Sequence, residues 1–233
     1  MGWQSSTAQA LIRRIEGWAS AGLADLTDGA DGCPLTPHRG GSVSNLERLA
    51  CLLARRNATD KQITALIGRP AIRGNIGEWI AQEIFGVELE ESGIQRGFDG
   101  RFADGPLAGK TVNVKWYGER AGVIDINPDA FPDYYLVMTG PKAVAQPAGH
   151  RFLPLVIAEV FLFDTPALVQ RLRRRGVRLG IGASVRKGEW EEARVYPAAA
   201  DGVRLTITDA QKEALKLFTE TGRSGGGEAK AAE

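Results

Sequence analysis

The sheet of this protein can be predicted from one stretch of its sequence, GFDGRFADGPLAGKTVNVKWY, which spans residues 97–117. Two runs of extended character, 97–103 and 110–117, flank a linker rich in glycine, with one proline. Such a pattern is typical of a β-hairpin. We therefore expect two antiparallel strands at the centre of the fold.

The second strand of this hairpin carries a polar pair. Strand side chains alternate between faces, so Asn113 and Lys115 point to one side while Val112 and Val114 point to the other, into the core. If the hairpin closes around its linker, Asp99 lies on the neighbouring strand within reach of Asn113. Polar groups are thereby held on a rigid element.

The segments around the hairpin predict an α/β fold. Apolar spacing and capping patterns predict helices and strands in alternation. We expect helices at 75–85, 165–174 and 208–218 and further strands at 134–139, 155–163 and 179–184. The expected architecture is a mixed central β-sheet flanked by helices.

An N-terminal helical segment precedes this domain. Helical spacing predicts a first helix at 7–24, a loop rich in glycine and proline at 29–41, and two short helices at 44–56 and 59–67, each opened by a capping box. The predicted organisation is a helical segment at 1–72, an α/β domain at 73–220 and a disordered tail at 221–233, where glycine, alanine and charge cannot build a core.

Composition excludes several classes of protein. Of 233 residues, 43% are hydrophobic and 24% are charged, and 29 basic residues against 28 acidic ones leave a net charge of +1, so no bulk positive field indicates a partner. The longest apolar stretch, 153–163, is broken by Glu159 and is far shorter than the roughly 20 residues that span a bilayer. We expect neither a membrane protein nor a secreted precursor, and we interpret Cys33 and Cys51 as free thiols of the cytoplasm.

The polar groups of the hairpin suit phosphodiester hydrolysis. A carboxylate oxygen of Asp99, the amide oxygen of Asn113, the backbone carbonyl of Val114 and Glu78 from the preceding helix are hard oxygen ligands for Mg²⁺, with Mn²⁺ as the alternative ion. Lys115 can orient a water molecule as the nucleophile and offset the charge that builds on the phosphate. The sequence thus predicts a metal-dependent catalytic site.

These residues resemble the PD-(D/E)xK nuclease superfamily, the restriction endonucleases and their relatives. The resemblance covers roughly 75–163, and Glu78, Asp99 and Lys115 match the family pattern. Asn113 departs from it, because the family usually has aspartate or glutamate there, although Mrr-like restriction endonucleases are known with a glutamine. The resemblance implies a restriction-endonuclease-like fold, a Mg²⁺-dependent endodeoxyribonuclease and DNA as the partner.

Basic and aromatic side chains near this site are candidates for nucleic-acid binding. Tyr117 follows the lysine on the same strand face and can stack on a base. The remaining candidates can each hold a phosphate, although exposed basic side chains are ordinarily solvated surface: Arg73, Arg96, Arg101, Arg120 and Lys187. A denser cluster of arginines, within 171–178, ends a helix whose dipole favours cations.

Two other functions stay open. The asparagine can mark a nuclease fold that has lost cleavage and only binds nucleic acid or a protein. Alternatively, residues 44–68 form a helix-turn-helix that reads DNA, and the sheet is its scaffold. A homodimer is equally open, since symmetry would place two sites on two strands.

Overall fold

A computed structural model describes residues 45–90, 97–143 and 152–219 of the chain. The chain divides into two compact units, Met1–Ala71 and Ile72–Glu233. The helix predicted at 7–24 and the tail predicted at 221–233 lie outside the described residues. Among the helices of the described ranges, none combines the length and the hydropathy needed to span a bilayer.

The described part of the first unit contains one helix, α2 (Asn45–Ile67). The prediction of two short helices joined by a tight turn is therefore wrong. The Thr59 hydroxyl donates to the Arg55 carbonyl at 3.1 Å, and Arg56 and Asp60 form an ion pair at 3.6 Å across one helical turn. Thr59 thus bonds back into the helix instead of capping a new one.

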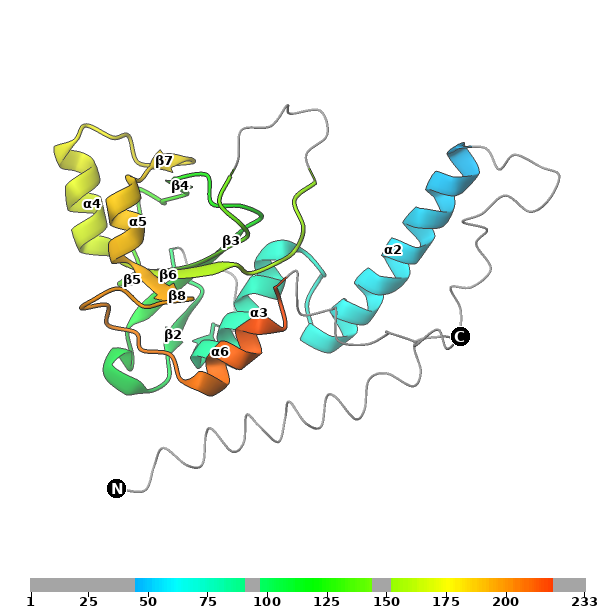
Figure 1. Ribbon diagram of the computed structural model, residues 1–233, viewed down its shortest axis with the longest axis horizontal. Coiled ribbons are helices and arrows are strands. Elements are labelled where there is room, and N and C mark those ends of the chain that lie inside the picture. The colour runs from blue at the N-terminus through cyan, green and yellow to red at the C-terminus, as the bar shows by residue number, and fades with distance from the viewer. Residues whose placement is uncertain (1–44, 91–96, 144–151, 220–233) are drawn as a thin grey trace, which may run out of the picture. The chain divides into compact units, whose positions relative to one another are not determined.

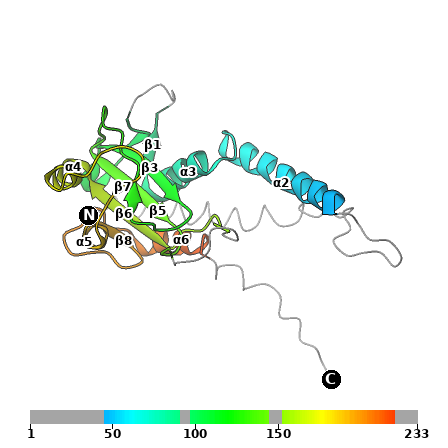
Figure 2. The same cartoon turned by 90° about the horizontal axis from the view of Figure 1, so that it is seen from above.

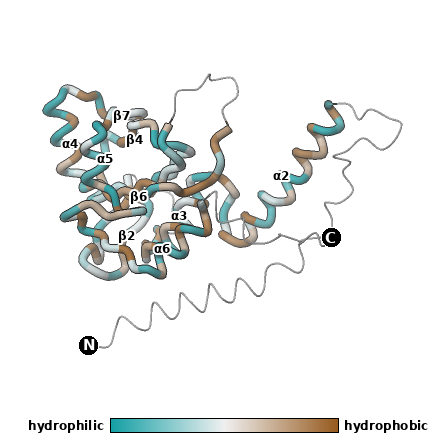
Figure 3. Tube along the Cα trace, in the orientation of Figure 1, coloured by the Kyte–Doolittle hydropathy of each residue, from teal (hydrophilic) through white to brown (hydrophobic). Residues whose placement is uncertain are grey.

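Helix α2 exposes apolar side chains and holds one oxidised cysteine. Leu46 is 75% exposed and Leu66 is 57% exposed, and apolar segments of the helix stand out in brown in Figure 3. Cys51 is disulfide-bonded, so the expectation of two free thiols is wrong. Two cysteines are too few for a disulfide framework but suffice for one bridge. Cys33 lies outside the described residues.

The second unit is built on a mixed sheet of six strands in the order β1-β2-β3-β5-β6-β8 (Figure 1). Every pair is antiparallel except β3 and β5, which run parallel. A separate antiparallel pair is formed by β4 and β7. The strands are β1 (Val87–Leu89), β2 (Gly100–Phe102), β3 (Thr111–Tyr117), β4 (Val123–Ile124), β5 (Tyr134–Thr139), β6 (Glu159–Asp164), β7 (Ala183–Ser184) and β8 (Arg194–Tyr196).

Helices flank this sheet, which confirms the predicted α/β class. The hairpin of β2 and β3 forms as expected, with a single 3-10 turn, η1 (Gly105–Leu107), in its linker. The helices of the second unit are α3 (Arg73–Phe85), α4 (Thr165–Arg174), α5 (Lys187–Glu192) and α6 (Asp209–Lys216). Strand β5 and helix α4 have the predicted bounds, whereas β1, β4, β8 and α5 were not predicted.

The two faces of the sheet carry different helices. On one face, Val114 and Trp116 are buried against α3, where a Cβ atom on Gly77 would lie 3.2 Å from the Cβ of Trp116. Helix α6 lies beside α3 (Figures 1 and 2), and the Gln211 side chain donates to the Ile84 carbonyl at 2.6 Å. The absence of a side chain at Gly77 therefore allows α3 to pack closely against β3 at Trp116.

The opposite face packs against α4 and α5. Its cluster of buried aromatic and aliphatic side chains includes Tyr135 and Phe161 of the sheet, Leu172 of α4 and Trp190 of α5. The Trp190 ring meets the Phe161 ring edge to face, with centroids 4.7 Å apart. This is also the face to which Asn113 and Lys115 belong, because each pairs in register with a member of the cluster on β5.

Candidate functional site

Asp99 and Asn113 lie opposite each other across the hairpin. Asp99 immediately precedes β2, and the register of β2 with β3 sets it beside Asn113. The Asn113 side-chain amide donates to one carboxylate oxygen of Asp99 at 3.3 Å, and the Val114 backbone N–H donates to the other at 2.7 Å. The predicted proximity of these residues is confirmed.

The Asp99 carboxylate extends the hydrogen bonding between β2 and β3 beyond Gly100, the first residue of β2. The Asp99 N–H still donates to the Val112 carbonyl at 2.9 Å, but among the described residues no strand pairs with this edge of β3 beyond that point. Because the N–H and carbonyl of one strand residue point to the same side, the Val114 carbonyl also points to this edge. Carboxylate, amide and carbonyl oxygens thus gather at one open edge.

The amide oxygen of Asn113 is the informative atom of this group. Its Oδ1 atom is buried and has no hydrogen-bond partner among the described residues. A buried acceptor without a donor costs about 1–3 kcal/mol. A cation or a water molecule at this position would remove that cost, so the donor set fits a hard divalent ion.

Lys115 lies on the same face of β3, two residues further along. Its side chain is half-buried, and it forms no ion pair or side-chain hydrogen bond with the residues that the structure describes. A partly buried ammonium without a counter-ion favours an anionic ligand. Lys115 is therefore placed as the sequence predicts, in line with Asn113 and available to a phosphate.

Glu78 does not share that face. It lies on α3, which packs against the side of the sheet that carries Val114 and Trp116. To join the site, the Glu78 carboxylate has to reach around the open edge of β3. The structure thus brings three of the four predicted polar groups together on the hairpin and places the fourth on the helix behind it.

Tyr135 is a neighbour of this site that the sequence did not reveal. It pairs in register with Asn113 on β5 and is 2% exposed. Burial raises the pKa of Tyr135 to about 12, a hydrogen bond with the Asn127 backbone acts in the opposite direction, and the negative charge of Asp99 raises the pKa further. Tyr135 therefore stays a neutral phenol beside Asp99.

Among the predicted phosphate-binding residues, Arg73 lies close to the end of β3. Its guanidinium contacts Gly118, where a Cβ atom would lie 3.2 Å from one Nη atom. One Nη atom donates to the Leu153 carbonyl at 3.5 Å, and the buried Nε atom has no partner among the described residues. Arg73 thus keeps unused donor capacity close to the strand that carries Lys115.

The other predicted basic residues have protein partners or lie outside the structure. Arg120 is an ion-pair partner of Glu159 at 2.6 Å, and Lys187 pairs with Glu191 at 3.4 Å. Arg101 donates to the Gly109 carbonyl at 3.1 Å and stacks over the Phe98 ring. Arg96 lies outside the described residues. Their roles in nucleic-acid binding stay predictions.

Tyr117 packs against the cluster under α4 and α5. Its hydroxyl oxygen accepts a hydrogen bond from the Asp125 N–H at 2.9 Å, and burial raises its pKa above the usual range of a phenol. The ring is thus used in packing, and the stacking role stays a prediction.

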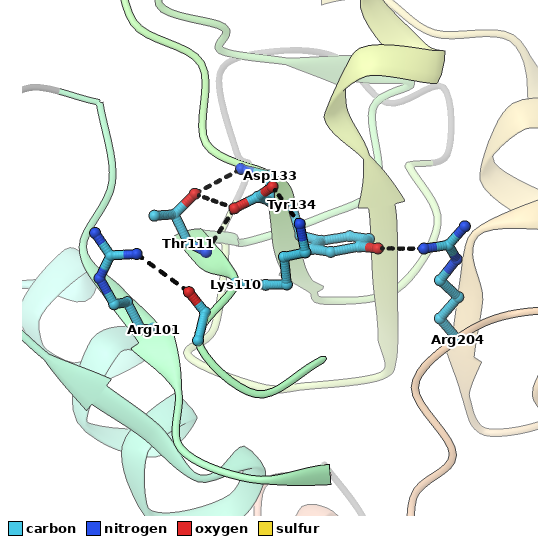
Figure 4. Close-up of polar contacts among 7 residues, drawn as sticks. Arg101, Lys110, Thr111, Asp133, Tyr134 and Arg204 are labelled. Carbon is cyan, nitrogen blue, oxygen red and sulfur yellow. Dashed lines mark hydrogen bonds and ion pairs between the residues drawn. The ribbon is translucent and has the colours of Figure 1, made fainter. Parts of the chain in front are cut away.

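A second carboxylate, Asp133, organises the other side of β3 (Figure 4). One of its oxygens accepts from the Thr111 N–H at 2.9 Å and from the Thr111 hydroxyl at 2.8 Å, and the other accepts from Lys110 at 3.2 Å. Burial alone would raise the pKa of Asp133, but the bonds from Thr111 and Lys110 outweigh it and lower the pKa. This closed network fixes the start of β3 to the loop before β5.

Within residues 45–90, 97–143 and 152–219, no three or more His, Cys, Asp or Glu side chains are arranged to hold a metal ion. An ion at the hairpin would therefore depend on amide and carbonyl oxygens as well as on Asp99. No protein-family model matches the chain, and no curated protein is similar to it. The resemblance to the PD-(D/E)xK superfamily rests on the residues alone.

Proposed function

We propose that this protein is a Mg²⁺-dependent endonuclease that hydrolyses phosphodiester bonds of DNA. One observation carries the proposal. Asp99 and Asn113 face each other at the open edge of β3, the Asn113 amide oxygen is buried without a partner in the described chain, and Lys115 follows on the same face. This combination offers ligands to a hard cation and a positive charge to a phosphate.

The chemistry follows from these side chains. Asp99, the Asn113 amide oxygen and the Val114 carbonyl would hold the ion, with Glu78 as a ligand from α3. The ion, when bound, supplies Lewis-acid activation of water and of the phosphate. Lys115 binds the scissile phosphate, orients the attacking water and offsets the negative charge that develops on the phosphoryl oxygens.

A second candidate function is a binding module without cleavage. The observation that favours it is the amide of Asn113, which donates to Asp99 and leaves the hairpin with a single carboxylate at this edge. Such a site would hold a phosphate through Lys115 without activating water. The helix-turn-helix alternative is not proposed, because α2 is one continuous helix.

The proposed DNA substrate also indicates where in the cell the enzyme acts. We propose the cytoplasm as the compartment of the enzyme, because DNA is found there. A homodimer would set two such sites on the two strands of a duplex and convert nicks into double-strand breaks.

The test is cleavage of a supercoiled plasmid by the full chain. We expect nicked or linear DNA with Mg²⁺ or Mn²⁺ and none with EDTA. The Asp99→Asn variant, purified in parallel, controls for a contaminating nuclease. Intact plasmid at every metal concentration, or equal cutting by the wild type and the variant, would overturn the proposal.

A further inference from the structure

A cavity separate from the candidate active site lies between the loop before β5 and the first turns of α4. This cavity has a volume of about 400 Å³, which is within the range of small-ligand sites. Its apolar lining includes Phe131 and Val169, and its polar lining consists of Thr165, Gln170, Arg173 and Arg174. None of these residues belongs to the candidate active site.

The aromatic ring of this cavity is accessible. Phe131 is 41% exposed, and the Arg173 guanidinium lies over its ring, 5.6 Å from the centroid. An exposed aromatic ring beside an arginine is the combination that proteins use to stack an unpaired base and hold its phosphate. The exposed part of the Phe131 ring is available for contact with a flat aromatic ligand.

The charges of the cavity favour an anion. Arg171 of α4 pairs with Glu192, and Arg175, the residue that follows α4, pairs with Glu189. In contrast, Arg173 and Arg174 have no acidic partner among the residues that the structure describes. The two arginines at the cavity therefore keep an uncompensated positive charge, which complements a phosphate.

A hydroxyl group of the cavity lacks a partner. Thr165 is 0% exposed, and its Oγ1 atom has no hydrogen-bond partner within the described chain. Gln170 adds an exposed amide with donor and acceptor atoms. An exposed amide such as that of Gln170 can bond the polar edge of a nucleobase.

The cavity is held in place by the Asp133 network. The Thr165 N–H donates to the Asp133 carbonyl at 3.0 Å, and the Asp133 side chain is bound by Thr111 and Lys110 (Figure 4). Because Phe131 stands two residues before Asp133, the same network fixes both walls of the cavity. Such a site needs little reorganisation when a ligand enters.

The cavity also adjoins the candidate active site. Gly97, two residues before Asp99, packs so closely against Ala130 that a Cβ atom on the glycine would lie 2.5 Å from the Ala130 Cβ. Ala130 in turn precedes Phe131. The segment that leads into Asp99 and the segment that carries Phe131 therefore lie side by side.

We propose that this cavity receives one unpaired nucleobase, stacked on Phe131, with an adjacent phosphate held by Arg173 and Arg174. The inference deepens the proposed nuclease function, on which it rests for the presence of nucleic acid at this surface. It assigns a substrate state: single-stranded nucleic acid, or a duplex that has opened locally at the site.

The test is fluorescence anisotropy of a labelled oligothymidine with the full chain in EDTA. We expect Phe131→Ala to weaken binding roughly tenfold, as loss of one stacked base does. Phe152→Ala is the matched control, because Phe152 is 84% exposed and lies outside the cavity. The double variant Arg173→Ala/Arg174→Ala should weaken binding more than the control pair Arg178→Ala/Arg186→Ala.

One further variant guards against misfolding, and one comparison separates this inference from the nuclease. Phe131→Trp should keep or strengthen binding, because it retains a stacking ring. If plasmid is never cut but the difference between Phe131→Ala and Phe152→Ala persists, the nuclease fails and the base site stands. Equal binding by those two phenylalanine variants, or equal affinity for oligothymidine and an abasic strand, would overturn the base site.

Discussion

Two aspartates flank β3, and each accepts a backbone N–H of this strand, but the two carboxylates serve different purposes. Asp133, before β5, and Asp99, before β2, each accept a backbone N–H of β3, from Thr111 and from Val114 respectively. Around Asp133 the network closes, because Lys110, which immediately precedes β3, supplies the counter-charge at 3.2 Å. Around Asp99 it stays open, because the Asn113 oxygen has no partner among the described residues and Lys115 forms no ion pair there.

This difference indicates that the Asp133 carboxylate stabilises the fold, whereas the Asp99 carboxylate can bind a ligand. A satisfied network gains stability from each of its bonds, whereas a partly satisfied one bears the cost of the group left unpaired. Of these two networks, as far as the described residues show, the one at Asp99 bears that cost and the one at Asp133 does not. Substitutions at the two ends should therefore fall into two classes, those that remove activity and those that remove stability.

The largest effect is expected from Lys115→Ala. Loss of this positive charge should reduce plasmid cleavage by roughly a hundredfold to a thousandfold, the range seen when a transition-state charge loses its partner. The unfolding free energy should hardly change, because Lys115 makes no ion pair with the described residues. Cleavage rate and urea unfolding measure the two quantities.

Lys110→Ala is the matched control, at the residue that immediately precedes β3. This variant removes a lysine side chain of the same type from the Asp133 network, where Lys110 is about half-exposed. It should leave the cleavage rate within a small factor of the wild-type rate. If Lys115→Ala cuts at the wild-type rate, or if both variants lose activity equally, the distinction between the two ends of the hairpin disappears.

The next effect concerns the ligands. Asp99→Asn should lower Mg²⁺-dependent cleavage by roughly a hundredfold, and Asn113→Ala by less, because a hard ion prefers a carboxylate to an amide oxygen. Initial rates across a Mg²⁺ titration give the order. Equal losses in the two variants, or activity that survives chelation, would contradict it.

Asp133→Asn should show the opposite behaviour. We expect cleavage near the wild-type rate and a loss of about 1 kcal/mol of stability, a value kept small because the carboxylate is partly exposed. For a chain of this size, that corresponds to a fall in Tm of about 2–4 °C. Thermal unfolding of the two proteins measures it.

The pH dependence of that loss follows from the sign of the pKa shift. The pKa of Asp133 is lowered in the folded protein from its ordinary value of 3.8. Its contribution to stability is therefore present above about pH 4 and is lost as the pH falls through the lower, folded value. The stability difference between wild type and Asp133→Asn should shrink on acidification, and a difference that grows below pH 4 would show that Asp133 acts in another way.

Local patterns of the sequence predicted the parts of the fold that bury an apolar face. The alternation of β3, the apolar run of β5 and the proline at the start of α4 fixed those elements, because burial and turn chemistry act over a few residues. The prediction failed in α2, where Thr59 carried a capping pattern but bonds back to Arg55. The short strands β1, β4 and β8 have two or three residues each and present no period to detect.

The site was predictable only as far as one hairpin reaches. Register across a short linker placed Asp99 beside Asn113, since antiparallel pairing follows from the linker itself. The position of Tyr135 depends on the parallel pairing of β3 and β5, and no local sequence pattern predicts that pairing. The cavity at Phe131 depends on contacts with α4, more than thirty residues away in the chain.

The smallest effect is expected from Asn113→Asp, and it has the greatest power to decide between an enzyme and a binding module. The substitution replaces the amide that donates to Asp99 at 3.3 Å with a second carboxylate. Two carboxylates in contact repel each other and hold protons more tightly, so the metal-free variant should unfold at a slightly lower temperature than the wild type. Mg²⁺ should reverse that loss, since the pair now forms a stronger cation site.

If the hairpin is a working catalytic site, the variant keeps or modestly raises the cleavage rate and reaches its maximum at a lower Mg²⁺ concentration. If the site only binds nucleic acid, the added negative charge weakens DNA affinity, and no cleavage appears at any Mg²⁺ concentration. Asn57→Asp makes the same change on an exposed position of α2 and controls for net charge, with no expected response to Mg²⁺. Cleavage and anisotropy measured on one Mg²⁺ titration distinguish the two functions, because the results differ in sign and the control excludes a general electrostatic effect.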